Sequence, residues 1–300
     1  YPMWLKPVKS ASSELAYRVD DDETFHAAVA RLRQGVDRIG RPFEQILARV
    51  DLPEEVSSVG GSTALAEAAL HGVQVAVEGY VYKGEVVVYG VLDSVDYPGS
   101  SVFLRHQYPS ELPEEVCRRM REVAVETIGH MGIDNATFSI EFFHDPVEDG
   151  LNVLEINTRH SQSHAELFEM VDGVSNHERM LRLAFGQDPA LPSDARGEFR
   201  VAAEWYYRRF DDGVVRRVPT AEEVAGLEES LPGVKITIVP REGERLSRLQ
   251  AQDSYSYELA KIVIGAEDET EMRAKYERCV EALKFEFEEV DGPSDKLTEH

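Results

Sequence analysis

Apolar positions along the chain follow the spacing of helices in some segments and of strands in others. In residues 23–34, apolar side chains recur at i, i+4 and i+7 behind three aspartates at 20–22, which predicts a capped amphipathic helix. Residues 73–92 form a β-branched run that breaks at Lys83-Gly84. This pattern predicts two strands joined by a tight turn.

The same rules predict elements along the rest of the chain. Helices are expected at 114–131, 165–185 and 267–283, and strands at 1–6, 139–143, 152–157, 199–210 and 234–239. Helices and strands thus alternate without a repeat of 20 to 50 residues, which predicts an α+β fold. Glycines and prolines between 186 and 197 indicate a domain boundary, and the polar residues 291–300 are expected to be a flexible tail.

Two consecutive alternating segments predict a β-hairpin whose turn contains Asp149-Gly150. Side chains two residues apart in a strand share a face, so Glu155 and Asn157 point the same way. A turn centred near residue 148 would place Glu141 directly opposite Glu155. The hairpin therefore presents two facing carboxylates and one amide.

Directly opposed carboxylates repel each other, so a cation is expected between them. Mg²⁺ prefers oxygen ligands and is typically held by one or two carboxylates plus substrate phosphates, and Asn157 adds a neutral oxygen. Arg159, two residues on, would meet a transferring phosphoryl group or the charge on an acyl phosphate. The alternative is that Glu141 and Glu155 lie on a solvated face, paired with arginines.

A second candidate is Lys6, which ends an apolar strand and precedes the hydroxyl-rich residues 9–13. A lysine is a point charge suited to phosphate, and small residues let backbone N–H groups approach phosphate oxygens. Lysines also end strands without any ligand role, and that alternative stays open.

Length and charge narrow the class of protein. The 300 residues, 42% of them hydrophobic, suffice for two domains, and the net charge of −24 disfavours nucleic acid and anionic membranes as partners. Cys117 and Cys279 form no disulfide or zinc pattern, and no segment has the apolar length of a membrane span. We therefore expect a cytoplasmic protein. Because the chain opens on a strand without an initiating Met, a further domain is expected upstream.

Taken in order, four segments resemble the ATP-grasp superfamily: Lys6, 65–70, 138–142 and 154–159. The run 155–164 is similar to the Glu-Met-Asn-Thr-Arg-Ile-Gln-Val-Glu-His motif of biotin carboxylases. Residues 253–254 and 259–283 resemble that family's C-terminal domain. The likeness thus covers nearly the whole chain, without the family's N-terminal Rossmann-like domain.

The resemblance implies an α+β ATP-grasp fold of two lobes that enclose a nucleotide, followed by a smaller biotin-carboxylase-like C-terminal α+β domain. The implied limits are 1–68 for the small lobe, 69–197 for the core lobe, 198–290 for the C-terminal domain and 291–300 for the tail.

The resemblance also assigns roles to single residues. ATP would be contacted by Lys6, Ser12, Ser13, Glu67, Ala68, Leu70 and Gln74, although Gln74 stands where the family has a His or Glu near the ribose. Mg²⁺, or Mn²⁺, would be held by Glu141, Glu155 and Asn157. Arg159 would be catalytic and stabilise the phosphorylated intermediate.

Two departures point away from biotin chemistry. Ser163 stands where biotin carboxylases have the glutamate that acts on bicarbonate, and Tyr206 stands where an arginine holds biotin. Amino-acid and peptide ligases are the relatives that keep the metal hairpin without these residues. The resemblance therefore implies an ATP- and Mg²⁺-dependent carboxylate-amine ligase that acts on small-molecule acid and amine substrates through an acyl phosphate, with a homodimer left open. The alternatives are a biotin-carboxylase-like carboxylating enzyme and a non-catalytic nucleotide-binding module.

Four weaker features complete the candidates. His160 and His164 have a spacing that zinc sites use, or they simply continue the loop after the metal strand. Glu78 would face the nucleotide or the solvent. Residues 105–107 lie near the phosphates or in a solvated loop, and the aromatic run 205–210 is expected to be core.

Overall fold

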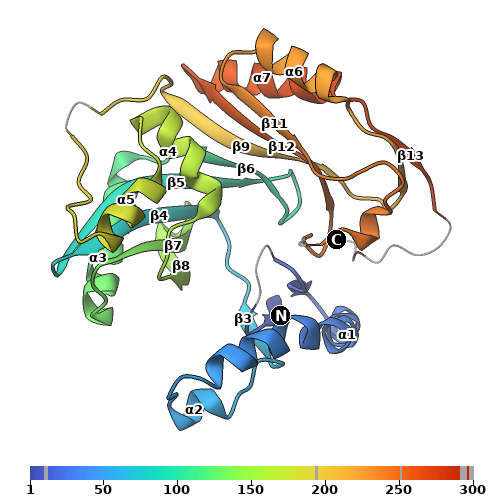
Figure 1. The fold of residues 1–300 in the computed structure, drawn as a ribbon. Coiled ribbons are helices and arrows are strands. Elements are labelled where there is room, and N and C mark those ends of the chain that lie inside the picture. Colours follow the sequence, from blue (N-terminus) through green and yellow to red (C-terminus); the bar gives the residue numbers. More distant parts are fainter. Residues whose placement is uncertain (10–12, 193–194, 251, 291–295, 297–300) are drawn as a thin grey trace.

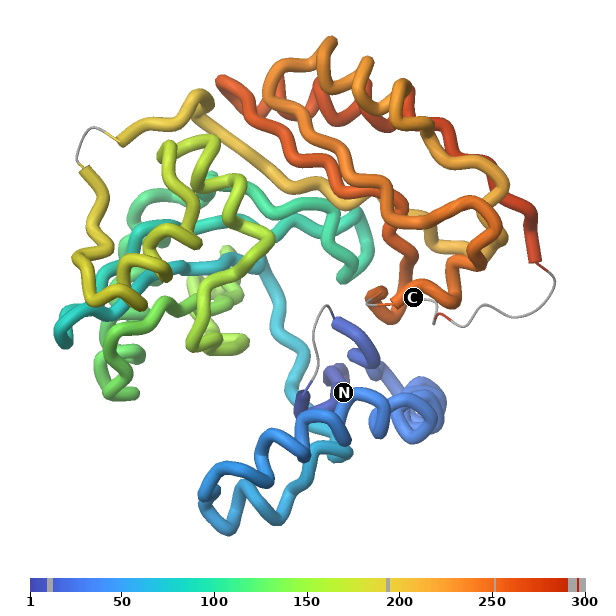
Figure 2. Tube along the Cα trace, in the orientation of Figure 1, coloured from blue at the N-terminus to red at the C-terminus, as the bar shows by residue number. Residues whose placement is uncertain are grey.

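The computed structural model describes residues 1–9, 13–192, 195–250, 252–290 and 296. A small N-terminal lobe lies beside a much larger body built on one long sheet (Figure 1). The Cα trace shows that a single extended segment leads from the small lobe into the sheet (Figure 2).

The small lobe contains a three-stranded antiparallel sheet in the order β2-β1-β3. Its elements are β1 (Met3–Pro7), β2 (Tyr17–Val19), α1 (Asp22–Leu47), α2 (Glu54–Ser57) and β3 (Ala64–Ala68). The Asp21 carboxylate accepts a hydrogen bond from the Thr24 N–H in a capping box, which confirms the predicted helix start. Leu32 of α1 packs against Leu5 and Val19 of the sheet.

The large sheet has eight antiparallel strands in the order β11-β12-β9-β6-β5-β4-β7-β8. They are β4 (Val73–Tyr82), β5 (Glu85–Asp96), β6 (Phe103–Tyr108), β7 (Ala136–Asp145), β8 (Gly150–Asn157), β9 (Val201–Arg209), β11 (Val234–Ile238) and β12 (Tyr257–Ala266). Lys83 and Gly84 both have positive φ between β4 and β5, which confirms the predicted tight turn. The mixed α and β content confirms the predicted fold class.

Helices cover both faces of this sheet. On one face lie α3 (Glu114–Met131), α6 (Ala221–Ser230) and α7 (Glu269–Ala282), and on the other lie α4 (Ala165–Asp172) and α5 (Asn176–Ala184). The alternation of β4 divides its side chains between the two layers: Val75 and Val77 pack with α3, whereas Ala76 packs with α4. Register pairs show that Glu141 shares the face of Ala76.

The predicted single helix at 165–185 is wrong, because two helices meet there at Gly173. This residue has a φ of 78°, and a Cβ on it would lie 2.5 Å from the Arg196 carbonyl oxygen. The left-handed backbone ends α4, and Ser175 caps α5 by accepting from the His177 N–H.

The C-terminal strands continue the same sheet, because β6 pairs with β9. Short elements complete this region: η1 (Gln162–His164), β10 (Val214–Arg217), η2 (Leu246–Arg248) and β13 (Glu286–Glu288). The domain limits at 68 and 197 stay predictions, and the expected tail at 291–300 falls, except for residue 296, outside the described residues.

Two expectations about the whole chain can be compared with the structure. Cys117 and Cys279 are both buried and free. Within the described ranges, no helix has both the length and the apolar character needed to cross a membrane.

The small lobe touches the large body through the turn that precedes β12. The Arg18 N–H donates to the Tyr255 hydroxyl at 2.7 Å, and the Ser254 hydroxyl donates to the Ser13 carbonyl at 3.3 Å. Trp4 meets the Tyr255 ring edge to face, with centroids 6.4 Å apart. The two parts of the chain thus share a polar and aromatic contact.

Candidate active site

The predicted opposition of two carboxylates is confirmed: Glu141 of β7 pairs directly with Glu155 of β8. A β-bulge between Glu141 and Phe142 brings this about, because Phe142 pairs with Val153 and leaves Leu154 as an extra residue on β8. In an unbroken ladder, Glu141 would face Leu154 instead.

Burial and like charge make Glu141 hard to ionise. Burial and the charge of Glu155 raise the pKa of the Glu141 carboxyl to about 7. The Gln74 amide donates to Glu141 Oε2 at 2.8 Å, and the Asn157 amide donates to Glu155 Oε1 at 2.7 Å. Repulsion within this pair would be relieved by a cation.

The oxygen atoms of Glu141, Glu155 and Asn157 fit Mg²⁺. Two carboxylates and an amide form too small a set for a cage made of protein alone, but Mg²⁺ commonly completes its octahedron with waters and substrate phosphates. Within the described part of the chain, no group of three or more His, Cys, Asp or Glu side chains is arranged to hold a metal. A metal here would therefore rely on the substrate for further ligands.

Arg159 lies just beyond the end of β8 and is exposed. One guanidinium nitrogen donates to the His160 carbonyl at 3.2 Å. The side chain thus follows the carboxylate pair in the chain with its charge accessible, as expected for a residue that meets an anionic group.

The residues predicted to contact ATP fall into two groups. In the small lobe, Lys6 of β1 and Glu67 of β3 form an ion pair at 2.5 Å, and Ala68 pairs with Met3 in the same sheet. Leu70 lies in the segment that leads to β4, and Ser13 lies in a turn after β1. Ser12 falls outside the described residues.

On the large sheet, the residue predicted to contact ATP is Gln74. It is 9% exposed and donates its amide N–H to Glu141, so it lies beside the carboxylate pair. Its predicted contact with the ribose is not tested by these positions and stays a prediction.

Glu78 differs from both alternatives that the sequence left open. It faces neither a nucleotide nor solvent, because it is fully buried. Its carboxylate accepts hydrogen bonds from four donors: Tyr89 Oη at 2.8 Å, Ser161 N at 3.1 Å, His164 Nδ1 at 2.7 Å and Asn176 Nδ2 at 3.0 Å. Burial raises the pKa of Glu78, but the bonds from His164, Asn176 and Tyr89 outweigh it and leave the pKa below its ordinary value.

The zinc hypothesis for His160 and His164 is wrong. His164 turns to Glu78, whereas His160 contacts Thr137 at 3.1 Å and His177 at 2.8 Å. The loop hypothesis for residues 105–107 is also wrong, because they belong to β6 and both Arg105 and Gln107 are buried.

The predicted core role of the aromatic run 205–210 is confirmed for Trp205 and Tyr206, which are buried, and is wrong for Phe210, which is 43% exposed. Trp205 is 2% exposed and stacks on Tyr276 with centroids 4.0 Å apart. The sequence reasoning missed the role of Glu78, although a signal existed. A charged residue in the otherwise apolar run of β4 is unusual unless partners satisfy it.

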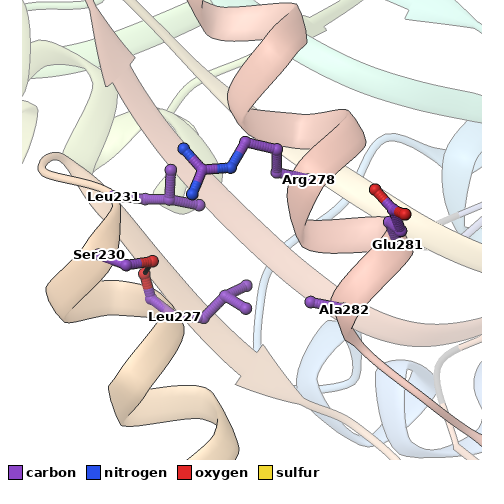
Figure 3. Close-up of a pocket in the computed structure, with 6 residues that line it drawn as sticks. All are labelled: Leu227, Ser230, Leu231, Arg278, Glu281 and Ala282. Carbon is purple, nitrogen blue, oxygen red and sulfur yellow. Dashed lines mark hydrogen bonds between the residues drawn. The ribbon is translucent and has the colours of Figure 1, made fainter.

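A separate depression of about 220 Å³ lies between α6 and α7 (Figure 3). It is lined by Leu227, Ser230, Leu231, Arg278, Glu281 and Ala282. These helices cover the face opposite Glu141, so the depression is separate from the carboxylate pair.

Part of this sequence is similar to a known ligase. A D-alanine–D-alanine ligase from Kineococcus radiotolerans is 29% identical over 171 residues, which are 53% of this chain and 39% of that protein. The chain therefore spans about two fifths of that relative's length.

Solved structures share the fold at low identity. The L-amino acid ligase from Bacillus licheniformis superposes with a TM-score of 0.73 at 18% identity over 96% of this chain and 65% of that one. The biotin carboxylase domain of 2-oxoglutarate carboxylase from Hydrogenobacter thermophilus gives a TM-score of 0.60 at 17% identity over 96% and 58%.

The family model described as an ATP-grasp domain matches residues 1–165. This match takes in Lys6 in the small lobe, the facing Glu141 and Glu155, and Arg159. Since it covers more than half of the 300 residues, the chain belongs to the ATP-grasp family.

Proposed function

We propose that the protein is an ATP- and Mg²⁺-dependent ligase that joins a carboxylate to an amine through an acyl phosphate. The observation that carries the proposal is the direct opposition of Glu141 and Glu155, with Asn157 beside them. Burial and the charge of Glu155 raise the pKa of Glu141, so the facing pair is costly to keep together unless a cation binds between the two carboxylates.

In this proposal the substrate carboxylate attacks the γ-phosphorus of ATP, ADP leaves, and an acyl phosphate forms. The amine then attacks the acyl carbon, loses a proton and expels inorganic phosphate. Glu141, Glu155 and Asn157 hold Mg²⁺, which screens the phosphate charges when it is bound. Arg159 meets the negative charge that develops on the transferred group.

Nucleotide binding is assigned mainly to residues of the small lobe and of the segment that leads from it to β4. Lys6 exchanges its Glu67 partner for a phosphate, and the segment from Glu67 through Leu70 lies along the base. Ser13, in the turn after β1, is assigned to the phosphates. Support comes from the Hydrogenobacter structure, whose crystals contain MgADP.

A ligase is favoured over a biotin-dependent carboxylase by the segment after β8. The Ser163 hydroxyl is hydrogen-bonded to the Ser161 hydroxyl at 2.8 Å, and neither side chain is a carboxylate that would act on bicarbonate. The names of the Bacillus and Kineococcus relatives, an L-amino acid ligase and a D-alanine–D-alanine ligase, support amino acids as the substrate class.

The decisive experiment measures phosphate release from ATP by the full-length protein. A panel of amino acids and amino-acid pairs is compared with biotin plus bicarbonate. Stimulation by an acid and amine pair, with a dehydrated product of matching mass, supports the ligase. Stimulation by biotin and bicarbonate alone would refute it, and no stimulation by either would favour a non-catalytic nucleotide-binding module.

Exchange of Glu155 for Gln tests the metal assignment. The variant should lose turnover while retaining its fold, because one carboxylate is removed at nearly constant volume. Unchanged ATP turnover would show that Glu155 does not hold the metal.

A further inference from the structure

The Glu78 carboxylate is an unusual feature of the large sheet, because an ionised group with no solvent access must be fully satisfied by the protein. Four donors satisfy it. Tyr89, on the adjacent strand β5, belongs to the sheet, whereas the other three come from the chain that follows β8.

Two of these donors, Ser161 and His164, lie two and five residues after Arg159. The Ser161 N–H and the His164 ring both bond to Oε1 of Glu78, at 3.1 and 2.7 Å. One oxygen of the buried Glu78 carboxylate thus binds both the backbone amide of Ser161 and the side chain of His164. These two bonds attach the segment 161–164 to strand β4 of the sheet.

Asn176 completes the attachment from α5. Its amide nitrogen donates to Oε2 of Glu78 at 3.0 Å and to the Ser161 carbonyl at 2.8 Å. Both polar backbone groups of Ser161 are therefore bound, its N–H by Glu78 and its carbonyl by Asn176.

Arg159 lies between two fixed points of the backbone. Before it, Asn157 is held in the β7–β8 ladder opposite Ser139. After it, the buried His160 donates its backbone N–H to the Thr137 hydroxyl at 3.1 Å, and Ser161 is bound by Glu78. The guanidinium itself remains exposed, so the network restricts where the Arg159 backbone lies.

We propose that Glu78 and His164 form a positioning pair that holds Arg159 at the end of the carboxylate hairpin. This inference rests on the proposed function for its catalytic consequence. The charge of Glu78 provides the strength of the attachment, since hydrogen bonds to an ionised group contribute more than neutral ones. A glutamine at this position cannot accept from all four donors, because one of its two head-group atoms is itself a donor.

The structure offers a matched set of variants. Glu78→Gln and His164→Ala weaken the attachment. His164→Asn retains a donor close to the position of Nδ1. Tyr89→Phe removes a donor to the same carboxylate from the sheet side and leaves the segment after Arg159 untouched.

Turnover separates positioning from general stability. For Glu78→Gln and His164→Ala we expect kcat to fall about 10- to 100-fold, because displacing a reacting group by about 1 Å has effects of this size. The KM for ATP should change less than about threefold, because neither residue contacts the nucleotide. His164→Asn should recover most of the kcat, and Tyr89→Phe should retain it.

Hydrogen–deuterium exchange provides a readout that needs no activity. In Glu78→Gln, amides in residues 158–164 should exchange faster, while Tyr89→Phe leaves them protected. If the wild-type protein releases no phosphate with any substrate, the proposed function fails while the exchange result still decides the positioning role.

Two results would overturn the inference. One is unchanged exchange at residues 158–164 in Glu78→Gln. The other is a kcat that falls equally in His164→Asn and His164→Ala, since the donor at this position would then have no role. If Glu78→Gln does not fold, the two His164 variants still decide the question.

Discussion

Replacing Glu141 with Gln should stabilise the metal-free protein at neutral and alkaline pH. Glu141 has a pKa of about 7 in the folded protein against an ordinary value of 4.5, because burial and the charge of Glu155 disfavour its ionised form. When the pKa of a carboxyl is higher in the folded than in the unfolded protein, the free energy of unfolding falls as the pH rises above the pKa of the unfolded state. The full loss of stability is reached above the pKa of the folded state.

The size of the effect follows from the shift. The difference between about 7 and 4.5 corresponds to about 3 kcal/mol at pH 8, at about 1.4 kcal/mol for each pKa unit. About 2 kcal/mol of this develops between pH 5.5 and pH 8. Glutamine retains an oxygen for the hydrogen bond from Gln74, so the change removes the charge and little else.

The assay is urea unfolding of both proteins at several pH values in EDTA. The stability difference should widen from pH 5.5 to pH 8 in favour of Glu141→Gln. Glu148→Gln, exposed in the turn of the same hairpin, is the control and should follow the wild type. Parallel curves for the wild type and Glu141→Gln would refute the reasoning.

Magnesium should offset most of this difference in stability. A ligand that binds only the folded state adds about 2.7 kcal/mol at 100 times its dissociation constant. The wild type should gain this stability when Mg²⁺ is added. Glu141→Gln should gain much less, because it lacks one of the proposed metal ligands. Equal stabilisation of both proteins by Mg²⁺ would place the metal elsewhere.

Three further variants test other parts of the structure. Lys6→Ala should weaken ATP binding at least tenfold in a calorimetric titration with little loss of stability, and unchanged affinity would remove its phosphate role. Gly79→Ala should destabilise the fold by about 2 kcal/mol or more in urea, because a Cβ would lie 2.2 Å from the Phe138 ring; a neutral effect would contradict this packing. Tyr255→Phe removes the acceptor of the Arg18 N–H and should cost about 1 kcal/mol by thermal unfolding, with no change expected if the two parts do not touch in solution.

Local pattern was sufficient for many elements. The helix predicted at 114–131 coincides with α3, and the turn at Lys83-Gly84 is where the structure has it. These features depend on residues close together in sequence, so periodicity and turn chemistry identify them. The helix at 165–185 failed because a left-handed Gly173 packs tightly against residue 196, a contact that periodicity does not contain.

The carboxylate pair was predicted with the correct partner, but the structure shows why that partner is correct. The β-bulge shifts the ladder by one residue at Leu154, and it brings Glu155 rather than its apolar neighbour opposite Glu141. A turn centred near residue 148 predicted the right partner, but the observed turn pairs Asp145 with Gly150, and an unbroken ladder from that turn would pair Glu141 with Leu154.

The sequence by itself determined the chemistry of the hairpin, the nearby arginine and the family resemblance, because these depend on residue types at short spacing. Only the tertiary structure decided the environment of Glu78, whose donors Ser161, His164 and Asn176 are 83 to 98 residues away. It also decided that the C-terminal strands extend the central sheet through β6 and β9. Partners so distant in sequence are brought together by packing of helices and strands, and no local pattern records which of them will meet.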